Sequence, residues 1–181
     1  MNEDWKKTLR RQRDAKDEYF AEDPRSPVPD EVREDFPGLD YYPVDETYRY
    51  ETELHEHDDP ERVTVATSTE GERTYLRWGE FRIEVASRDV TLQAYKSDPD
   101  DDRLWVPFRD QTSGDETYGA GRYIDLESQV HENEDGTWTL DFNEAYNPTC
   151  AYSDAYDCPL PPADNWLDVA VEAGERKPPW K

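Results

Sequence analysis

The residues with the greatest chemical potential lie in two segments, 107–126 and 141–167. These segments combine guanidinium groups, carboxylates, amides and phenol hydroxyls, which together bind anionic or polyhydroxylated ligands. The candidate ligand-binding residues are Arg109, Asp110, Tyr118, Arg122, Tyr123, Asp141, Asn143, Tyr146 and Asn147. We expect a polar pocket shaped by 107–123 and 141–147 that takes a small polar or anionic ligand.

An enzyme is a second interpretation of the same two segments. Asp110 or Asp141, if partly buried, would serve as the general acid or base. Arg109 or Arg122 would then hold an anionic substrate through charge-assisted hydrogen bonds. The corresponding hypothesis is that both guanidinium groups converge with Asp141 and Tyr146 around one polar cavity.

Two interpretations without a pocket also stay open. In the first, Arg–Asp pairs form a structural network that pins the long loops to a β-sheet, because an unpaired buried charge costs several kcal/mol. In the second, the protein is a structural or interaction module whose Trp and Tyr patches meet another chain. Convergent polar groups in a cleft would favour a ligand site, whereas a flat aromatic patch would favour the interaction module.

Common cofactor and metal motifs do not occur in this sequence. Gly119 and Gly121 resemble the start of a dinucleotide-binding loop, but Ile124 stands where the third glycine belongs. There is no Walker loop, nucleophile elbow, HExxH or CxxC motif. His55 and His57 share one face of an expected strand, yet a structural zinc site needs about four ligands. We therefore predict neither a cofactor nor a metal site.

The two cysteines of the chain, Cys150 and Cys158, are separated by seven residues. A disulfide between them would close a small loop that Pro148 and Pro159 constrain. A cytosolic environment would instead keep both thiols free. The sequence leaves both states open.

Acidic residues dominate the composition. Lys and Arg number 21 against 45 Asp and Glu, a net charge of −24. The resulting self-repulsion fades in concentrated salt, where the Debye length falls to about 3 Å at 1 M. We therefore expect a halophilic protein that repels nucleic acid and anionic lipid. With neither a signal-peptide pattern nor a long apolar run, the expected location is cytoplasmic, away from membranes.

The expected organisation is a single domain over residues 1–181. An N-terminal helix occupies 1–22, a proline-rich lead-in 23–46, a β body 47–174 and a tail 175–181. Residues 5–16 within the first of these segments hold six basic residues and one acidic residue, and we expect this stretch to pack on the acidic remainder of its own chain.

Period-two alternation is the main signal after residue 47. Phe81, Ile83 and Val85 alternate with charged residues, and turn residues such as Gly71 and Gly79 interrupt the pattern. The predicted fold is mainly β, an antiparallel barrel or sandwich with an N-terminal α-helix and long Pro-rich loops.

Several short motifs carry a family resemblance. They are Phe108-Arg109-Asp110, Thr112-Ser113-Gly114, Thr117 to Tyr123, Asp141-Phe142-Asn143, Ala145 to Pro148, Cys150-Ala151-Tyr152, Cys158 to Pro162 with Asn165, and Gly174-Glu175. With them the chain resembles the domain of unknown function 1684 family, in a haloarchaeal-type form. The resemblance supports the fold and implies no activity.

Overall fold

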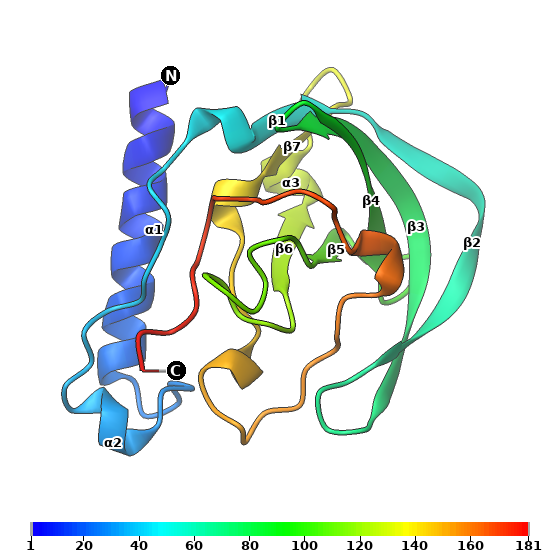
Figure 1. The fold of residues 1–181 in the computed structure, drawn as a ribbon. Coiled ribbons are helices and arrows are strands. Elements are labelled where there is room, and N and C mark those ends of the chain that lie inside the picture. Colours follow the sequence, from blue (N-terminus) through cyan, green and yellow to red (C-terminus); the bar gives the residue numbers. More distant parts are fainter. Residues whose placement is uncertain (1, 181) are drawn as a thin grey trace.

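The computed structural model describes residues 2–180. Its helical segments in that range are α1 (Asn2–Glu22), α2 (Asp30–Arg33), η1 (Glu46–Tyr48), α3 (Ser128–His131), η2 (Phe142–Glu144), η3 (Thr149–Ala151) and η4 (Ala163–Asn165). Its strands are β1 (Arg49–Thr52), β2 (Leu54–Ala66), β3 (Glu72–Val85), β4 (Arg88–Lys96), β5 (Arg103–Phe108), β6 (Arg122–Glu127) and β7 (Trp138–Asp141) (Figure 1).

Strands β2 to β6 form one antiparallel sheet in the order β2-β3-β4-β5-β6, and β1 pairs with β7 in a second sheet. Side chains from both sheets share one hydrophobic core. In the described chain β2 and β6 do not pair with each other, so the larger sheet does not close into a barrel. The predicted mainly β fold with an N-terminal helix is confirmed, and its arrangement is sandwich-like.

The two faces of the larger sheet differ in chemistry. On one face, aliphatic residues such as Leu92, Leu104 and Ile124 pack into the core, covered by β7 and the segment 169–173. Because successive side chains of a strand point to opposite faces, the intervening residues lie on the other side. There Tyr95 and Trp105 approach each other, with ring centroids 5.8 Å apart. This aromatic face is the one that carries the cavity described below.

Gly79 was predicted to be a turn residue, and this prediction is wrong. Gly79 lies inside β3, where the pairing register shifts between Arg77 and Gly79. A Cβ atom at this position would lie 2.9 Å from the carbonyl oxygen of His55 on β2. The glycine therefore permits a close approach of two strands, which is a second common role of glycine inside a sheet.

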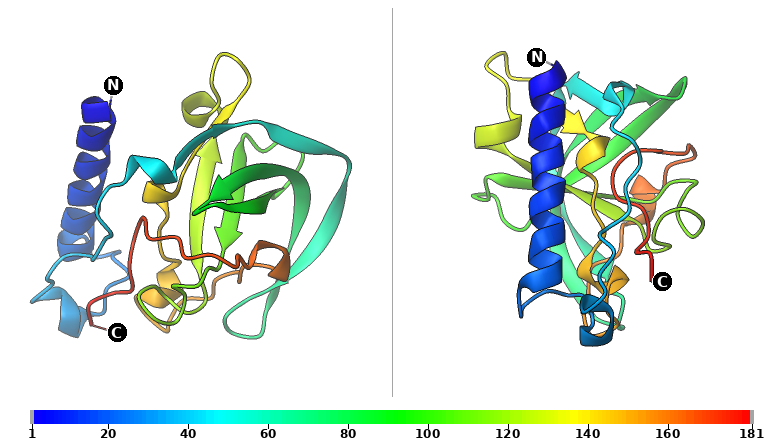
Figure 2. Two further views of the ribbon diagram at one scale, coloured as in Figure 1. Left: turned by 45° about the horizontal axis from the view of Figure 1, so that its top comes forward. Right: turned by 90° about the vertical axis from the view of Figure 1, so that its left-hand side faces the viewer.

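Helix α1, which contains the basic stretch 5–16, packs against the acidic remainder of the chain, as expected (Figure 2). Trp5 Nε1 donates to Asp141 Oδ2 at 2.8 Å, Arg13 Nη1 donates to the Tyr42 carbonyl at 3.3 Å, and Lys16 Nζ lies 2.7 Å from Glu175 Oε2. Figure 2 also shows the proline-rich lead-in, which contains α2, running beside α1. No helix within residues 2–180 is long and apolar enough to cross a membrane.

Candidate functional site

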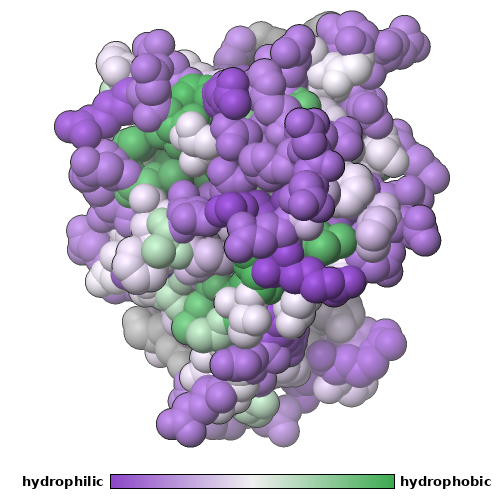
Figure 3. All heavy atoms as spheres, turned by 90° about the vertical axis from the view of Figure 1, so that its right-hand side faces the viewer, coloured by the Kyte–Doolittle hydropathy of each residue, from purple (hydrophilic) through white to green (hydrophobic). Residues whose placement is uncertain are grey.

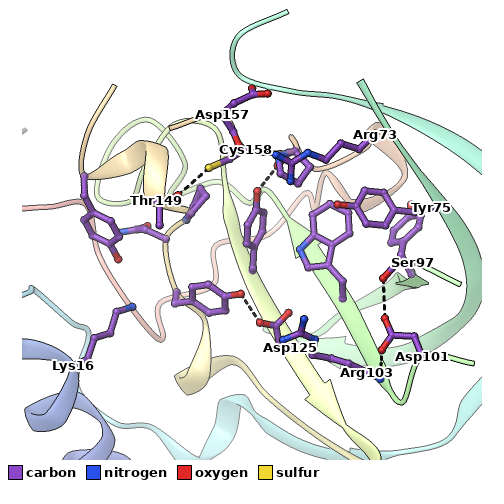
Figure 4. A pocket seen from close by; sticks show the side chains of 18 of the residues that line it. Lys16, Arg73, Tyr75, Ser97, Asp101, Arg103, Asp125, Thr149, Asp157 and Cys158 are labelled. Carbon is purple, nitrogen blue, oxygen red and sulfur yellow. Dashed lines mark hydrogen bonds between the residues drawn. The ribbon is translucent and has the colours of Figure 1, made fainter. Parts of the chain in front are cut away.

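A cavity of about 540 Å³ lies on the aromatic face of the larger sheet. We call it the aromatic pocket. Its aromatic side chains are Phe20, Tyr75, Tyr95, Trp105, Tyr123, Tyr146 and Tyr152. Its charged side chains are Lys16, Arg73, Asp101, Arg103, Asp125 and Asp157, and loop residues 147–149 and 157–159 complete the wall (Figure 4).

Strand order produces the aromatic wall. Trp105 on β5 packs against Tyr75 of β3, with ring centroids 4.5 Å apart and an interplanar angle of 30°. On its other side Trp105 meets Tyr123 of β6 edge-on at 5.2 Å, and Tyr123 meets Tyr146 edge-on at 5.8 Å. Both geometries are favourable for rings, and pairs of this kind contribute about 0.5–1.5 kcal/mol beyond area burial. These contacts therefore link the rings of Tyr75, Trp105, Tyr123 and Tyr146 into one continuous wall.

Charge in the aromatic pocket is balanced. Three bases and three acids line it, whereas the remainder of the chain carries 18 bases against 42 acids. Arg73 Nη2 donates to the Asp157 carbonyl at 3.0 Å, and Asp101 accepts from the Ser97 hydroxyl at 2.8 Å. The exposed Arg103 side chain has no hydrogen bond or ion pair to another described residue. In a protein with a net charge of −24, this is a site where an anionic group meets little repulsion.

Asp125 and Tyr146 form a hydrogen-bonded pair in the pocket wall (Figure 4). The Tyr146 hydroxyl donates to Asp125 Oδ2. Burial raises the pKa of the Asp125 carboxyl, although the hydrogen bond from Tyr146 and the nearby charge of Arg103 oppose that shift. A partly buried carboxyl group with a raised pKa, facing a cavity, has the character of a general acid or base.

Two buried polar atoms of the pocket residues lack a hydrogen-bond partner among the described residues. They are the Tyr95 hydroxyl and Asn147 Oδ1. Tyr95 is completely buried, and this burial raises the pKa of its hydroxyl. An unsatisfied buried polar group costs about 1–3 kcal/mol. Neither atom has exposed surface, so this cost lies within the wall of the pocket and not on a group that a ligand in the cavity contacts.

Glu175 holds one end of the pocket together. Its carboxylate, 1% exposed, accepts from Lys16 Nζ at 2.7 Å, from Asn147 Nδ2 at 3.1 Å and from the Tyr152 hydroxyl. Its backbone follows Gly174, which has a φ of 81°. A Cβ atom on that glycine would lie 2.7 Å from the Phe142 carbonyl. The glycine thus lets the C-terminal segment approach closely enough for Glu175 to contact three residues of the pocket lining.

Of the residues predicted from the sequence, Tyr123, Tyr146 and Asn147 line the aromatic pocket. Arg122 and Asp110 do not. They are fully buried on the core side, where Arg122 Nη2 lies 3.5 Å from Asp110 Oδ2. Arg122 also donates to the backbone carbonyls of Val171, Ala173 and Glu175. We call this the Arg122 network; it has the structural role considered above.

The other predicted residues lie in separate contacts. Asp141 and Asn143 form a hydrogen-bonded turn, with the Asn143 N–H donating to Asp141 Oδ1 at 2.9 Å. The Arg109 guanidinium lies over the ring of Trp166 at 4.8 Å, and the Tyr118 hydroxyl donates to Cys150 Sγ at 3.4 Å. The structure therefore does not bring Arg109, Arg122 and Asp141 together around the pocket.

Sequence reasoning missed Asp125, Arg103, Trp105 and Lys16. Trp105 and Asp125 are direct partners in the β5–β6 register, so strand alternation does place them on one face. Alternation does not show which face is hollow. Lys16 comes from a helix more than a hundred residues away in the sequence from Tyr146, and no local pattern signals that contact.

Residues 34–176 match the family described as "Protein of unknown function (DUF1684)". The chain belongs to this family. The chain is also similar to the solution NMR structure of an uncharacterized protein from Haloarcula marismortui. That protein is 44% identical, with a TM-score of 0.74 over 97% of this chain and 95% of that chain. Its source agrees with the halophilic character predicted from charge. No curated protein matches the chain.

The family match begins after α1, so the DUF1684 segment contains every strand of the described chain and most of the aromatic pocket. Lys16 and Phe20 are the two pocket residues that α1 adds. The family name assigns no activity, and the chemistry of the pocket has to be argued from its own side chains.

Proposed function

We propose that this DUF1684 protein binds a small ligand that carries a ring and an anionic group in the aromatic pocket. The observation that carries the proposal is a cavity lined by a continuous aromatic wall, with the exposed Arg103 guanidinium in its lining and without a described hydrogen-bond or ion-pair partner. Its volume of about 540 Å³ lies inside the range of roughly 300–1,000 Å³ that ligand pockets have.

The ring would lie against the Trp105–Tyr123 wall, because flat or amphipathic rings gain dispersion and quadrupole interactions there. The anionic group would pair with Arg103, whose guanidinium has five N–H donors and no described partner. Nucleic acid and anionic membranes stay excluded as partners in this proposal, because the surrounding surface is strongly acidic.

A titration followed by amide NMR tests this proposal. The probes are AMP, glucose 6-phosphate and indole-3-acetate, each compared with its neutral counterpart: adenosine, glucose and indole. We expect an anion to shift amides of 101–105 and 146–149 and to bind more tightly than its counterpart. A hydrogen bond to a charged group contributes about 1.5–3 kcal/mol, so Arg103→Ala should weaken binding roughly tenfold or more.

The matched control is Arg62→Ala, which removes an exposed arginine of the β2 strand outside the pocket. It should leave the affinity unchanged. Binding that Arg103→Ala and Arg62→Ala weaken equally, or the absence of shifts with every probe, would contradict the proposal.

The Asp125–Tyr146 pair favours an enzyme as the second candidate function. Asp125 would act as the general acid or base, and Arg103 would hold the anionic substrate. Asp110 and Asp141, the acids considered from the sequence, do not line the pocket. Turnover of p-nitrophenyl phosphate, acetate or glucoside that Asp125→Asn abolishes without loss of binding would support this candidate over a binding module.

An interaction module has weaker support. The large hydrophobic side chains that are exposed within residues 2–180 are Tyr19, Val130, Tyr156 and Trp166. They come from four separate segments of the chain. Figure 3 shows one face of the molecule, on which hydrophobic spots are interrupted by hydrophilic side chains. Such scattered exposure is normal for a protein surface.

A further inference from the structure

The two cysteines meet at the wall of the aromatic pocket. Helix η3 (Thr149–Ala151) holds Cys150 so that its backbone N–H donates to Cys158 Sγ at 3.3 Å. The Thr149 hydroxyl shares a second hydrogen bond of 3.3 Å with the same sulfur (Figure 4). Both thiols are free and buried. The spacing of the two cysteines in the sequence does not decide whether they lie close together, whereas the fold places them next to each other.

The two thiols differ in access and environment. Cys158 lines the aromatic pocket, so a small molecule in the cavity can reach the wall that it forms. Cys150 does not line the pocket, and its sulfur accepts a hydrogen bond from the Tyr118 hydroxyl at 3.4 Å. Burial raises the pKa of the Cys150 thiol, and the neighbouring Cys158 raises it further. Cys150 therefore lies next to Cys158 but outside the lining of the cavity.

We propose that Cys158 and Cys150 are a redox-active dithiol, in which Cys158 attacks a hydroperoxide that enters the aromatic pocket and Cys150 resolves the product. Buried structural cysteines are normally inert, but a thiol beside a cavity with a second thiol behind it has the arrangement of a redox pair. This modification site does not depend on the ligand class proposed above.

The chemistry balances in two steps. The Cys158 thiolate attacks one oxygen of hydrogen peroxide, the O–O bond breaks, and the second oxygen leaves as water after protonation. This step oxidises Cys158 to a sulfenic acid. The Cys150 sulfur then attacks the Cys158 sulfur, the S–O bond breaks, and a second water leaves. In sum, two thiols lose two hydrogens to a disulfide, and one peroxide becomes two waters.

Intact-mass measurement of the full chain tests this proposal. The reduced protein, freed of reductant in concentrated KCl, is treated with one to a few equivalents of hydrogen peroxide. We expect the mass to fall by about 2 Da and to return with dithiothreitol. Peptide mapping should place the bond between Cys150 and Cys158. In Cys150→Ser, dimedone should label Cys158 as a sulfenic acid, whereas in Cys158→Ser, Cys150 should react at least tenfold more slowly.

Near-ultraviolet circular dichroism checks that both serine variants keep the native fold. If either variant does not fold, limited alkylation of the native wild-type protein replaces it, and Cys158 should be labelled before Cys150. Two results would overturn the proposal: native protein that forms no disulfide under conditions in which the unfolded chain does, or Cys150 reacting first. Absence of probe binding in the NMR titration would leave these outcomes unaffected, so the two proposals fail separately.

Discussion

The Arg122 network and the aromatic pocket lie on opposite faces of the same strands, and both contain arginine and aspartate side chains. In the network, the Arg122 guanidinium is surrounded by Asp110 and three backbone carbonyls, with no exposed surface. In the pocket, Arg103 has no described side-chain partner, and Asp125 accepts a hydrogen bond from the Tyr146 hydroxyl beside the cavity. Residue types alone do not separate a structural cluster from a site. Access to the open donor does: Arg122 Nε also lacks a partner among the described residues but has no exposed surface, whereas the exposed Arg103 lines the cavity.

Salt concentration should have the largest effect on the stability of the protein. It should act on the acidic surface, outside the Arg122 network and the aromatic pocket. Most of the 45 acidic residues repel one another across the surface, and concentrated salt screens them. We expect Tm to rise by at least about 10 °C between dilute buffer and about 2 M KCl, since each kcal/mol shifts Tm by roughly 2–4 °C at this size. Thermal melting followed by circular dichroism measures it. A Tm independent of salt would contradict the halophilic interpretation.

Arg122→Ala should break the network and leave the pocket intact. Removing one partner of a buried ion pair leaves an uncompensated charge, here on Asp110, at a cost of about 3–5 kcal/mol. The measurement is urea unfolding in concentrated KCl. Arg103→Ala is the comparison on the pocket side and should change the free energy of unfolding by less than about 0.5 kcal/mol. Equal destabilisation by the two variants would remove the distinction between the regions.

Glu175 belongs to both regions, because its carbonyl accepts from Arg122 and its carboxylate accepts from Lys16. Glu175→Gln should destabilise the protein by about 1–2 kcal/mol, which is less than the loss of Arg122 because the Lys16 side chain is partly exposed.

A double-mutant cycle with Lys16→Gln sharpens this prediction. The coupling energy should be about 1 kcal/mol, since the side chains are in contact. Lys7→Gln, on an exposed position of α1, is the matched control and should show no coupling with Glu175→Gln. Hydrogen exchange should locate the loosening in α1.

The smallest expected effect is the change in stability with pH that comes from the ionisation of Asp125. Burial raises the pKa of Asp125 in the folded state, so this residue stabilises the fold at low pH and loses that contribution as pH rises through its pKa. Asp125→Asn cannot ionise. The Tm of the variant minus that of the wild type should therefore increase from about pH 3.5, below the ordinary pKa of aspartate, towards neutrality. A difference that is flat or falls with pH would show that Asp125 is not held in a desolvating wall.

Much of the fold could be predicted because its signals are local. Alternation in β3 to β6 comes from the pleat of each strand. In 5–16, a few apolar residues recur at helical spacing among many basic residues, and this pattern predicts a helix that packs on an acidic surface. Gly79 shows the limit. A glycine in a sequence marks either a turn or a close approach, and the carbonyl of His55 on the neighbouring strand decides between them.

The neighbours Arg122 and Tyr123 show where the sequence stops and the tertiary structure begins. Their adjacency in a strand determines that they point to opposite faces, and their types determine that each needs a polar partner when buried. Which face is hollow is decided by segments far away in the sequence. The segment 171–175 fills the space around Arg122, while α1 and the loops at 147–149 and 157–159 leave a cavity beside Tyr123. Alternation is a property of one strand, whereas a cavity depends on how distant segments fit over it, and only the packed chain determines that fit.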